Sequence, residues 1–358
     1  MAIKRKLGIV GAGNIGGILL LEIAARKLAR TIGIVDIKPP AVAAGKALDV
    51  AEGTPIINAD VNFVASRDFS ALEGCECVIN TAGVPRAMRP DGTFPSREEL
   101  LATNLQIADA VADGINTYCP DACLVNIANP LDAIVYRLHQ KLKKPKHRIS
   151  GMAGVLDTAR YRLFIAQEAG VSVENVEAMV LGGHGDTMVP IRSCTRIAGM
   201  PVEQFITSKR LDEIEDRVRK AGGEVVSLLG SGSAFVSPCW ATLEMMEAQV
   251  HDKKKILPVA TLLEGEYGVH GLFIGVPAIM GRGGIEKIIE VKMTPAEKEL
   301  FKASVEAVRQ TAREVDRMGA EMDKAKKSAG KPAVKKPAVK KAAAKKAPAK
   351  KPATGKKK

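Results

Sequence analysis

A glycine pattern near the start of the chain restricts the fold more than any other feature. Gly11, Gly13 and Gly16 follow the apolar run Lys6 to Val10 and open a stretch with helix-like apolar spacing, Asn14 to Ala29. In such a strand–loop–helix unit the glycines permit a tight turn, close backbone approach to a pyrophosphate, and close packing of helix on strand. The pyrophosphate then meets free N–H groups at the helix N-terminus. We therefore expect a nucleotide to bind Gly11, Ala12, Gly13, Asn14, Ile15 and Gly16.

An acidic residue indicates which nucleotide binds. Asp36 lies twenty residues after Gly16, near the end of the next apolar run, Thr31 to Ile37. A carboxylate there accepts hydrogen bonds from the ribose hydroxyls and repels a 2′-phosphate. The glycines alone are a weak signal, because an ordinary glycine turn would explain them. Together with Asp36 they predict a dinucleotide site that takes NAD rather than NADP.

Apolar runs continue to alternate with helix-like stretches up to about residue 150. We expect strands at Val61 to Ala65, Cys77 to Thr81 and Leu124 to Ala128, and a helix at Pro40 to Ala51. Strands that alternate with helical segments of about ten residues or more are typical of a parallel sheet with crossover helices. The sequence therefore predicts an α/β fold in which residues 1–150 form a Rossmann-type, doubly wound parallel sheet.

The element order is less regular in residues 151–322, where we expect an α+β substrate domain. Val176 to Leu181 is expected to form one strand. Thr294, Pro295 and Glu297 have the pattern of a capped helix start, which predicts a long helix from Pro295. Other helices are expected at Leu156 to Glu168, Leu211 to Leu229 and Ala234 to Val250, and other strands at Met188 to Arg192, Ile256 to Thr261 and Gly271 to Val276.

The end of the chain, residues 323–358, has a different composition. Residues 324–358 hold fifteen lysines and no acidic residue, in repeats such as KPAVK. Subtracting these charges from the net +13 leaves −2 for the rest of the chain. Repeated prolines and like charges predict a disordered tail. Such a tail resembles those of linker histones and can bind nucleic acid or another polyanion weakly and without sequence preference. A solubilising tether is an equally good interpretation.

Composition also bears on the compartment and on metal binding. The chain has no run of about eighteen apolar residues, so we expect no membrane span. Its six cysteines lie within apolar stretches, the pattern of reduced, buried thiols in a cytoplasmic protein. Cys119 and Cys123 have no second pair or histidine cluster to complete a zinc site, so we expect no metal.

A histidine between glycines is the candidate proton carrier. His184 stands in the sequence GGHGD, which follows an apolar run. Imidazole carries protons near neutral pH, and flanking glycines favour a tight loop that exposes the ring to a ligand. Asp186 and Asp157 are both possible carboxylate partners, and spacing does not choose between them. Taken alone, such a histidine is more often a hydrogen-bonded structural residue.

Arginines in an irregular segment are candidates for binding an acid. Arg86, Arg89 and Arg97 lie close together in the sequence, and Ser96 with Glu99 predicts a capping box that places Arg97 in the first turn of a helix. Guanidinium groups suit carboxylate recognition. An exposed basic loop is an equally good interpretation of this spacing.

These motifs together resemble the malate and lactate dehydrogenase family, most closely its bacterial malate dehydrogenases that are built like lactate dehydrogenases. The resemblance covers roughly residues 5–320, and it alone implies the substrate class, a small 2-hydroxy acid, and a homodimer or homotetramer. The matching motifs are GAGNIGG at 11–17, NTAGVPR at 80–86, SREELLATN at 96–104, NIANPLD at 126–132, GVLDTARYR at 154–162 and GGHGDTMVP at 182–190.

The resemblance implies catalytic and substrate-binding roles for five residues. His184 would accept the proton of the substrate hydroxyl, and Asp157 rather than Asp186 would hold its imidazole in the right tautomer. Arg97 would polarise the reacting carbonyl. Arg160 would bind the C1 carboxylate, and Arg86 would pair with the second carboxylate of malate.

Four further residues would serve the cofactor side of the site. Asn129 would hydrogen-bond the substrate and, with Ile127 and Ala128, line the nicotinamide site. Asn104 would contact the cofactor.

The segment between Arg86 and Arg97 departs from the family pattern. The malate enzymes usually have a shorter segment, whereas this chain has ten residues, Ala87 to Ser96. A similar lengthening occurs in lactate dehydrogenases of apicomplexan parasites, in which lysine replaces the specificity arginine and an aromatic residue meets the substrate. Phe94 can supply the aromatic ring here, but Arg86 is retained. We expect a malate dehydrogenase, with L-lactate dehydrogenase as one alternative and a DNA-associated protein on a retired enzyme scaffold as another.

Overall fold

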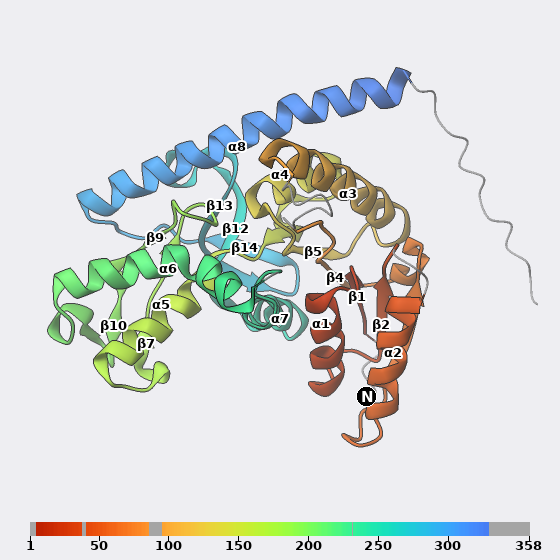
Figure 1. Cartoon of the computed structure of the whole chain (residues 1–358), viewed down its shortest axis with the longest axis horizontal. Coiled ribbons are helices and arrows are strands. Elements are labelled where there is room, and N and C mark those ends of the chain that lie inside the picture. Colours follow the sequence, from red (N-terminus) through yellow and green to blue (C-terminus); the bar gives the residue numbers. More distant parts are fainter. Residues whose placement is uncertain (1–4, 38–40, 86–94, 231, 329–358) are drawn as a thin grey trace, which may run out of the picture. The chain divides into compact units, whose positions relative to one another are not determined.

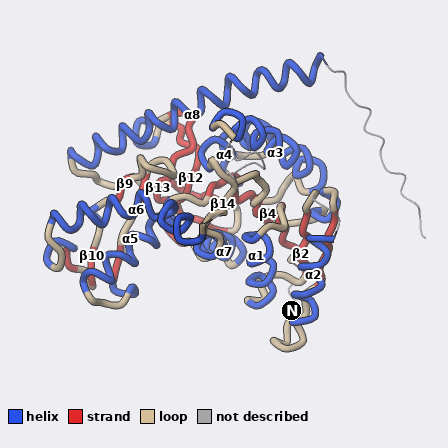
Figure 2. Tube along the Cα trace, viewed as in Figure 1, coloured by secondary structure: helices blue, strands red, loops and turns tan. Residues whose placement is uncertain are grey.

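The structure is a computed structural model, and it describes residues 5–37, 41–85, 95–230 and 232–328. Its largest sheet has nine strands in the order β14-β13-β12-β6-β5-β4-β1-β2-β3. Figure 2 shows the strands in red. Six parallel strands form one half of this sheet: β1 (Lys6–Val10), β2 (Thr31–Val35), β3 (Asn62–Ser66), β4 (Cys77–Asn80), β5 (Cys123–Asn126) and β6 (Ile149–Gly151). The order β3-β2-β1-β4-β5-β6 confirms the predicted Rossmann-type arrangement. The short strand β6 was not predicted.

Helices connect the parallel strands and cover the two faces of the sheet. They are α1 (Asn14–Ala25), α2 (Ala41–Gly53), α3 (Arg97–Tyr118) and α4 (Leu131–Lys141). Helix α3 packs on α4, whereas α1 packs on α2 and on α7 (Val236–Val250) (Figure 1). Leu19, Leu20 and Ile23 of α1 are fully buried, because their helical spacing puts them on the face turned to the sheet.

The other half of the sheet is antiparallel. β12 (Lys255–Glu264), β13 (His270–Gly281) and β14 (Gly284–Ile288) extend it, and β12 joins β6 where Ala260 pairs with Gly151. The strands expected in a separate α+β domain therefore continue the nucleotide-binding sheet, so the edge of β6 is covered by a paired strand. The residues up to Gly319 form one compact unit, and the domain boundary at residue 150 stays a prediction.

The prediction of one strand from Val176 to Leu181 was wrong, because this segment forms two short strands in different sheets. Val176–Glu177 forms β7 in a three-stranded sheet with β10 (Arg196–Ile197) and β11 (Met200–Pro201). Val180–Leu181 forms β8, which pairs with β9 (Val189–Pro190) in another sheet. At the start of β8, Val180 N donates to Thr158 Oγ1 of α5 (Gly154–Ala169) at 2.9 Å.

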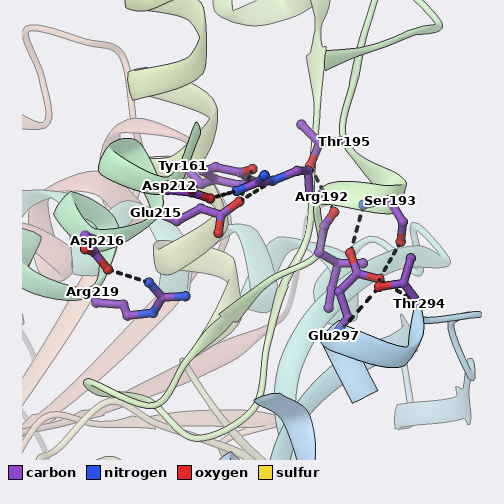
Figure 3. Close-up of polar contacts among 11 residues, drawn as sticks. Tyr161, Arg192, Ser193, Thr195, Asp212, Glu215, Asp216, Arg219, Thr294 and Glu297 are labelled. Carbon is purple, nitrogen blue, oxygen red and sulfur yellow. Dashed lines mark hydrogen bonds and ion pairs between the residues drawn. The ribbon is translucent and has the colours of Figure 1, made fainter. Parts of the chain in front are cut away.

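Two buried glutamates, one on α6 (Ser208–Leu229) and one on α8 (Pro295–Ser328), bind the segment that follows β9 (Figure 3). Glu297, near the start of α8, accepts hydrogen bonds from Thr294 N and from Ser193 N and Oγ. Glu215 of α6 accepts from Arg192 Nε at 2.9 Å. Glu297, which the sequence identifies as a capping residue, therefore also makes a tertiary contact with Ser193.

Helix α8 continues to Ser328, past residue 323 where the tail was expected to begin. Residues 323–328 contain no proline and consist mainly of alanine and lysine, which are good helix formers. Residues 329–358 lie outside the described part of the chain, so the predicted disorder of the tail stays a prediction. Within the described residues, no helix has both the length and the apolarity that crossing a membrane requires.

Candidate active site

The residues that follow the parallel strands meet along one edge of the sheet. Val35, Val10, Asn80 and Asn126 are the last residues of β2, β1, β4 and β5, and they are neighbours in the strand register. Ligands of open α/β sheets bind at this carboxyl edge. The sheet therefore brings together the glycine loop, Asp36 and the segment 127–129, which lie far apart in the sequence.

Close contacts at two glycines of the glycine loop leave no room for a side chain there. Gly11 has a φ of +98°, and a Cβ there would lie 2.5 Å from Thr81 Oγ1. A Cβ at Gly16 would lie 1.9 Å from the carbonyl oxygen of Gly11. At Gly13, by contrast, a Cβ would have no atom of the described residues within 4 Å. Two glycines thus hold the turn together, and the third faces open space.

The first turn of α1 is arranged to receive an anion. Gly13 is its N-cap and supplies no side-chain cap, so the N–H groups of Asn14 and Ile15 stand at an uncapped helix start. Lys46 of α2 donates to Gly13 O at 2.8 Å and brings a positive charge to the loop. Asp36 Oδ2 accepts from Ala12 N at 2.6 Å, which ties the carboxylate to the same loop. This donor set and the open space at Gly13 fit a dinucleotide.

Asparagines at the ends of two neighbouring strands support the same edge. Asn80 and Asn126 are fully buried, and Asn80 Nδ2 donates to Asn126 Oδ1 at 2.9 Å. Asn80 Oδ1 accepts from Ala82 N, and Asn126 Nδ2 donates to Ala128 O at 3.1 Å. Our sequence reasoning missed both residues, although each stands at the end of an apolar run within a recognised motif.

The predicted cofactor residues after β5 differ in exposure. Ile127 and Ala128 are buried, whereas Asn129 is exposed. The side chain of Asn104 on α3 is buried and bonds to the backbone of Val84 and to Asn129 O. Asn104 therefore joins the segments that follow β4 and β5, a contact that the sequence did not predict.

The structure brings His184, Asp157 and Arg160 together. His184 Nδ1 lies 2.8 Å from Asp157 Oδ2, and Arg160 Nη1 donates to Asp157 Oδ1 at 3.2 Å. The side chain of Asp157 is 2% exposed, that of His184 14% and that of Arg160 15%. Asp186 is exposed at the surface of the loop. Of the two possible carboxylate partners, the structure therefore selects Asp157.

Charges around the imidazole set its proton affinity. Burial by itself lowers the pKa of His184, but the carboxylate of Asp157 and then that of Asp132 outweigh it, so the pKa of His184 is raised above 6.5. Arg160 opposes them weakly. Burial raises the pKa of Asp132 to about 6, against the opposing effect of His184. The histidine therefore holds a proton more firmly than an exposed one would.

Two residues that sequence reasoning missed hold the histidine loop from outside. Asp132 Oδ2 of α4 accepts from His184 N at 2.9 Å. Ser304 Oγ of α8 accepts from Gly183 N, also at 2.9 Å. Asp132 ends the motif NIANPLD, so its place in that motif was the available signal. Ser304 carried no signal in the sequence.

The arginines of the lengthened segment are only partly accounted for. Arg97 is exposed and is the first residue of α3, where the predicted capping box of Ser96 and Glu99 is present. In the described part of the chain, no hydrogen bond or ion pair joins Arg97 to the histidine site. Arg86, Arg89 and Phe94 lie outside the described residues.

All six cysteines are unpaired, and five of them are buried. Burial raises the pKa of Cys75 to about 12 and also raises that of Cys119 and Cys123, which makes these thiols poor nucleophiles.

Comparison with known proteins places the chain in a family. The model of the lactate/malate dehydrogenase NAD binding domain matches residues 5–151, and that of the lactate/malate dehydrogenase alpha/beta C-terminal domain matches residues 154–318. A malate dehydrogenase of Rhodopirellula baltica is 44% identical over 319 residues, which cover 89% of this chain and 99% of that relative.

Solved structures show the same relationship. A malate dehydrogenase from Salinibacter ruber has a TM-score of 0.82 and 40% identity, and the match covers 88% of this chain and 99% of that one. A lactate dehydrogenase from Cryptosporidium parvum, complexed with lactic acid and nicotinamide adenine dinucleotide, has a TM-score of 0.83 and 36% identity, with the same coverage. The chain therefore belongs to the lactate/malate dehydrogenase family of NAD-dependent 2-hydroxy acid dehydrogenases.

Proposed function

We propose that the chain is a malate dehydrogenase that interconverts (S)-malate and oxaloacetate with NAD as its cofactor. The observation that carries the proposal is the 2.8 Å contact of His184 Nδ1 with Asp157 Oδ2, with Arg160 on the same carboxylate. Relatives that are 44% identical are named malate dehydrogenase, which supports this acid over lactate.

The glycine loop and Asp36 would hold NAD. The open space at Gly13 and the uncapped start of α1 support a pyrophosphate site there, and the carboxylate of Asp36 would accept the ribose hydroxyls. Ile127, Ala128 and Asn129 follow β5 at the same edge and would line the nicotinamide end. NAD bound there would supply the hydride acceptor for C2 of the hydroxy acid, and NADH would supply the hydride in the reverse direction.

His184 would move the proton. Asp157 beside Nδ1 favours the tautomer that carries its proton on Nδ1, which leaves the lone pair on Nε2. The substrate hydroxyl then gives its proton to Nε2, and Asp157 stabilises the imidazolium that forms. In the reverse direction the same Nε2 returns the proton to the carbonyl oxygen.

Arginines would bind and polarise the acid. Arg160 approaches Asp157 through Nη1 and is partly exposed, which supports a bidentate contact of its guanidinium with the C1 carboxylate. Arg97, at the start of α3, would polarise the reacting carbonyl. Arg86 would pair with the second carboxylate, because a buried carboxylate without a partner is costly.

An initial-rate matrix tests the proposal. NADH and NADPH are each combined with oxaloacetate, pyruvate and 2-oxoglutarate, using the full chain. We expect the highest kcat/KM for NADH with oxaloacetate. Faster turnover of pyruvate than of oxaloacetate would contradict malate as the substrate. The absence of turnover in every combination would contradict the proposed dehydrogenase activity.

Arg86 is tested by exchange for glutamine. We expect Arg86→Gln to lower kcat/KM for oxaloacetate by ~10²-fold and to affect pyruvate less, because only oxaloacetate carries the second carboxylate. Equal losses on both substrates would remove Arg86 as the discriminating residue.

L-lactate dehydrogenase is the second candidate function, because the segment 87–96 is long and lactate dehydrogenases are among the similar structures. If Phe94→Ala abolished pyruvate turnover in a protein that preferred pyruvate, the lactate assignment would replace ours.

A homodimer or homotetramer is also part of the proposal. Leu21 and Ile57 are exposed apolar side chains that line a groove of about 550 Å³ together with other residues of α1 and α2 and with Phe235. Leu48 of α2 and Trp240 of α7 are exposed as well. Contiguous exposed apolar surface is typical of protein interfaces. Analytical ultracentrifugation should give at least a dimer, and Trp240→Glu should shift it toward the monomer.

We place the protein in the cytoplasm, because its six cysteines are unpaired.

The lysine-rich tail is proposed to contact polyanions weakly. A DNA gel-shift series in rising salt should show binding that weakens steeply and that disappears when residues 329–358 are removed. Binding that does not depend on salt, or no binding, would contradict this contact.

A further inference from the structure

Two consecutive peptide N–H groups of the histidine loop are bonded to side chains from distant elements. His184 N donates to Asp132 Oδ2 of α4, and Gly183 N donates to Ser304 Oγ of α8. Neither Asp132 nor Ser304 takes part in the proton transfer proposed above. We propose that Asp132 is a positioning residue for His184, acting on the histidine's backbone while Ser304 secures the preceding peptide. This inference rests on the proposed role of His184 as proton acceptor.

The loop is packed so closely that these contacts restrict where it can lie. A Cβ at Gly183 would be 2.6 Å from Val308 Cγ2 and 3.2 Å from Asp132 Oδ2. Gly182 has a φ of +92°, and its Cβ would be 2.5 Å from Ser304 Oγ. The first two glycines of GGHGD thus allow α4 and α8 to approach the backbone directly. His184 is thus held at two places, by Asp132 at its backbone N–H and by Asp157 at Nδ1 of its ring.

Asp132 also has an electrostatic effect that a purely structural acceptor would lack. Its Oδ1 is buried and has no hydrogen-bond partner among the described residues. Such an atom in a native structure calls for an explanation. Among the described residues, the charged groups that act on His184 are Asp157 and Arg160 from α5 and Asp132 from α4. A buried carboxylate with one unused oxygen is more favourable when the neighbouring ring becomes a cation. Asp132 therefore favours the protonated ring that malate oxidation produces.

The experiment compares Asp132→Asn and Asp132→Ala with the wild-type full chain. The asparagine variant keeps an oxygen that accepts from His184 N but removes the negative charge, whereas alanine removes both. Two readouts are used. One is the pH profile of kcat and KM with malate and oxaloacetate. The other is the titration of the His184 ring by NMR of 15N-histidine-labelled protein without cofactor, with its signal assigned from a His184→Gln sample.

We expect Asp132→Ala to lose ~10²-fold in kcat, because a displaced base misses the reacting atom, while KM changes about threefold or less. Asp132→Asn should retain most of kcat. In both variants the midpoint of the His184 NMR titration should move to lower pH. Ser304→Ala should lower kcat without moving the titration, since serine carries no charge.

Asp109→Asn is the matched control, because Asp109 forms a buried ion pair with Arg137 on a different part of α4. It should lower the melting temperature and leave both the kinetic profile and the His184 titration unchanged. Our inference is overturned if Asp132→Asn titrates like the wild type, or if Asp109→Asn reproduces the effects of Asp132→Ala. Because the NMR titration needs no turnover, a protein inactive on all three 2-oxo acids would refute the proposed function and still leave Asp132 testable.

Discussion

The glycine loop and the histidine loop are both short, glycine-rich turns that follow a strand, but different forces hold them. The glycine loop depends mainly on steric contacts, between Gly16 and Gly11 inside the loop and between Gly11 and Thr81, together with the hydrogen bond of Ala12 N to Asp36. The histidine loop depends on polar side chains 27, 52 and 121 residues away, in α5, α4 and α8. The glycine pattern of the cofactor site is thus recognisable from one short segment of the sequence, whereas the residues that hold the histidine come from three separate helices.

The largest expected effect lies in the histidine loop. His184→Gln should lower kcat for oxaloacetate by ~10³-fold, because it removes the group that moves the proton. NADH affinity and the melting temperature should stay near wild type, since the glycine loop is untouched. Stopped-flow kinetics measures kcat, and NADH fluorescence titration measures the affinity for NADH. Retention of more than about a tenth of the wild-type kcat would show that another residue carries the proton.

The partner of the histidine gives the next largest effect and a pH signature. Asp157→Asn should cost ~10²-fold in kcat, because the carboxylate no longer stabilises the charged ring. Asp157 raises the pKa of His184, so the variant should titrate at lower pH than the wild type. Malate oxidation needs the neutral ring, so the rise of its kcat/KM with pH should occur at lower pH in the variant. Oxaloacetate reduction needs the protonated ring, so the fall of its kcat/KM with pH should also occur at lower pH. Asp186→Asn is the control, and an equal shift in that variant would refute the assignment.

The glycine loop is tested by two alanine substitutions that differ only in the space available. Gly16→Ala should destabilise the protein by about 1–3 kcal/mol, because its Cβ would meet the backbone oxygen of Gly11. Gly13→Ala should leave the melting temperature unchanged, since its Cβ faces open space. Both should weaken NADH binding. Equal melting temperatures for the two variants would contradict the steric account of the loop.

The smallest effect concerns cofactor choice. Asp36→Ser should lower the preference for NADH over NADPH by ~10-fold, because it removes the charge that repels a 2′-phosphate. The ratio of the two kcat/KM values measures it, with Asp49→Ser on α2 as a surface control. An unchanged ratio would assign the selectivity to a residue other than Asp36.

How far prediction reached depended on the range of the interactions. The strands after which Gly11 and Asp36 stand were predicted, because short apolar runs and the turns between them depend on nearby residues. The strand Val176 to Leu181 was predicted as one element because its apolar pattern is continuous. In the structure Val176 and Val180 pair with different strands, and Val180 N donates to Thr158 on α5, a contact that no local pattern records.

By itself, the sequence determined the Rossmann-type half, the glycine loop and the acidic residue beside it. The reason is that the apolar runs, the turns between them and the contact of Gly16 with Gly11 all involve residues that are close together in the sequence. Spacing left Asp157 and Asp186 open, the family resemblance implied Asp157, and the tertiary structure places Asp157 beside the imidazole. Only the tertiary structure joined the two halves in one sheet and set Asp132 and Ser304 on the histidine loop. Those outcomes depend on which side chains meet across α4, α5 and α8, and such meetings are decided by packing rather than by spacing along the chain.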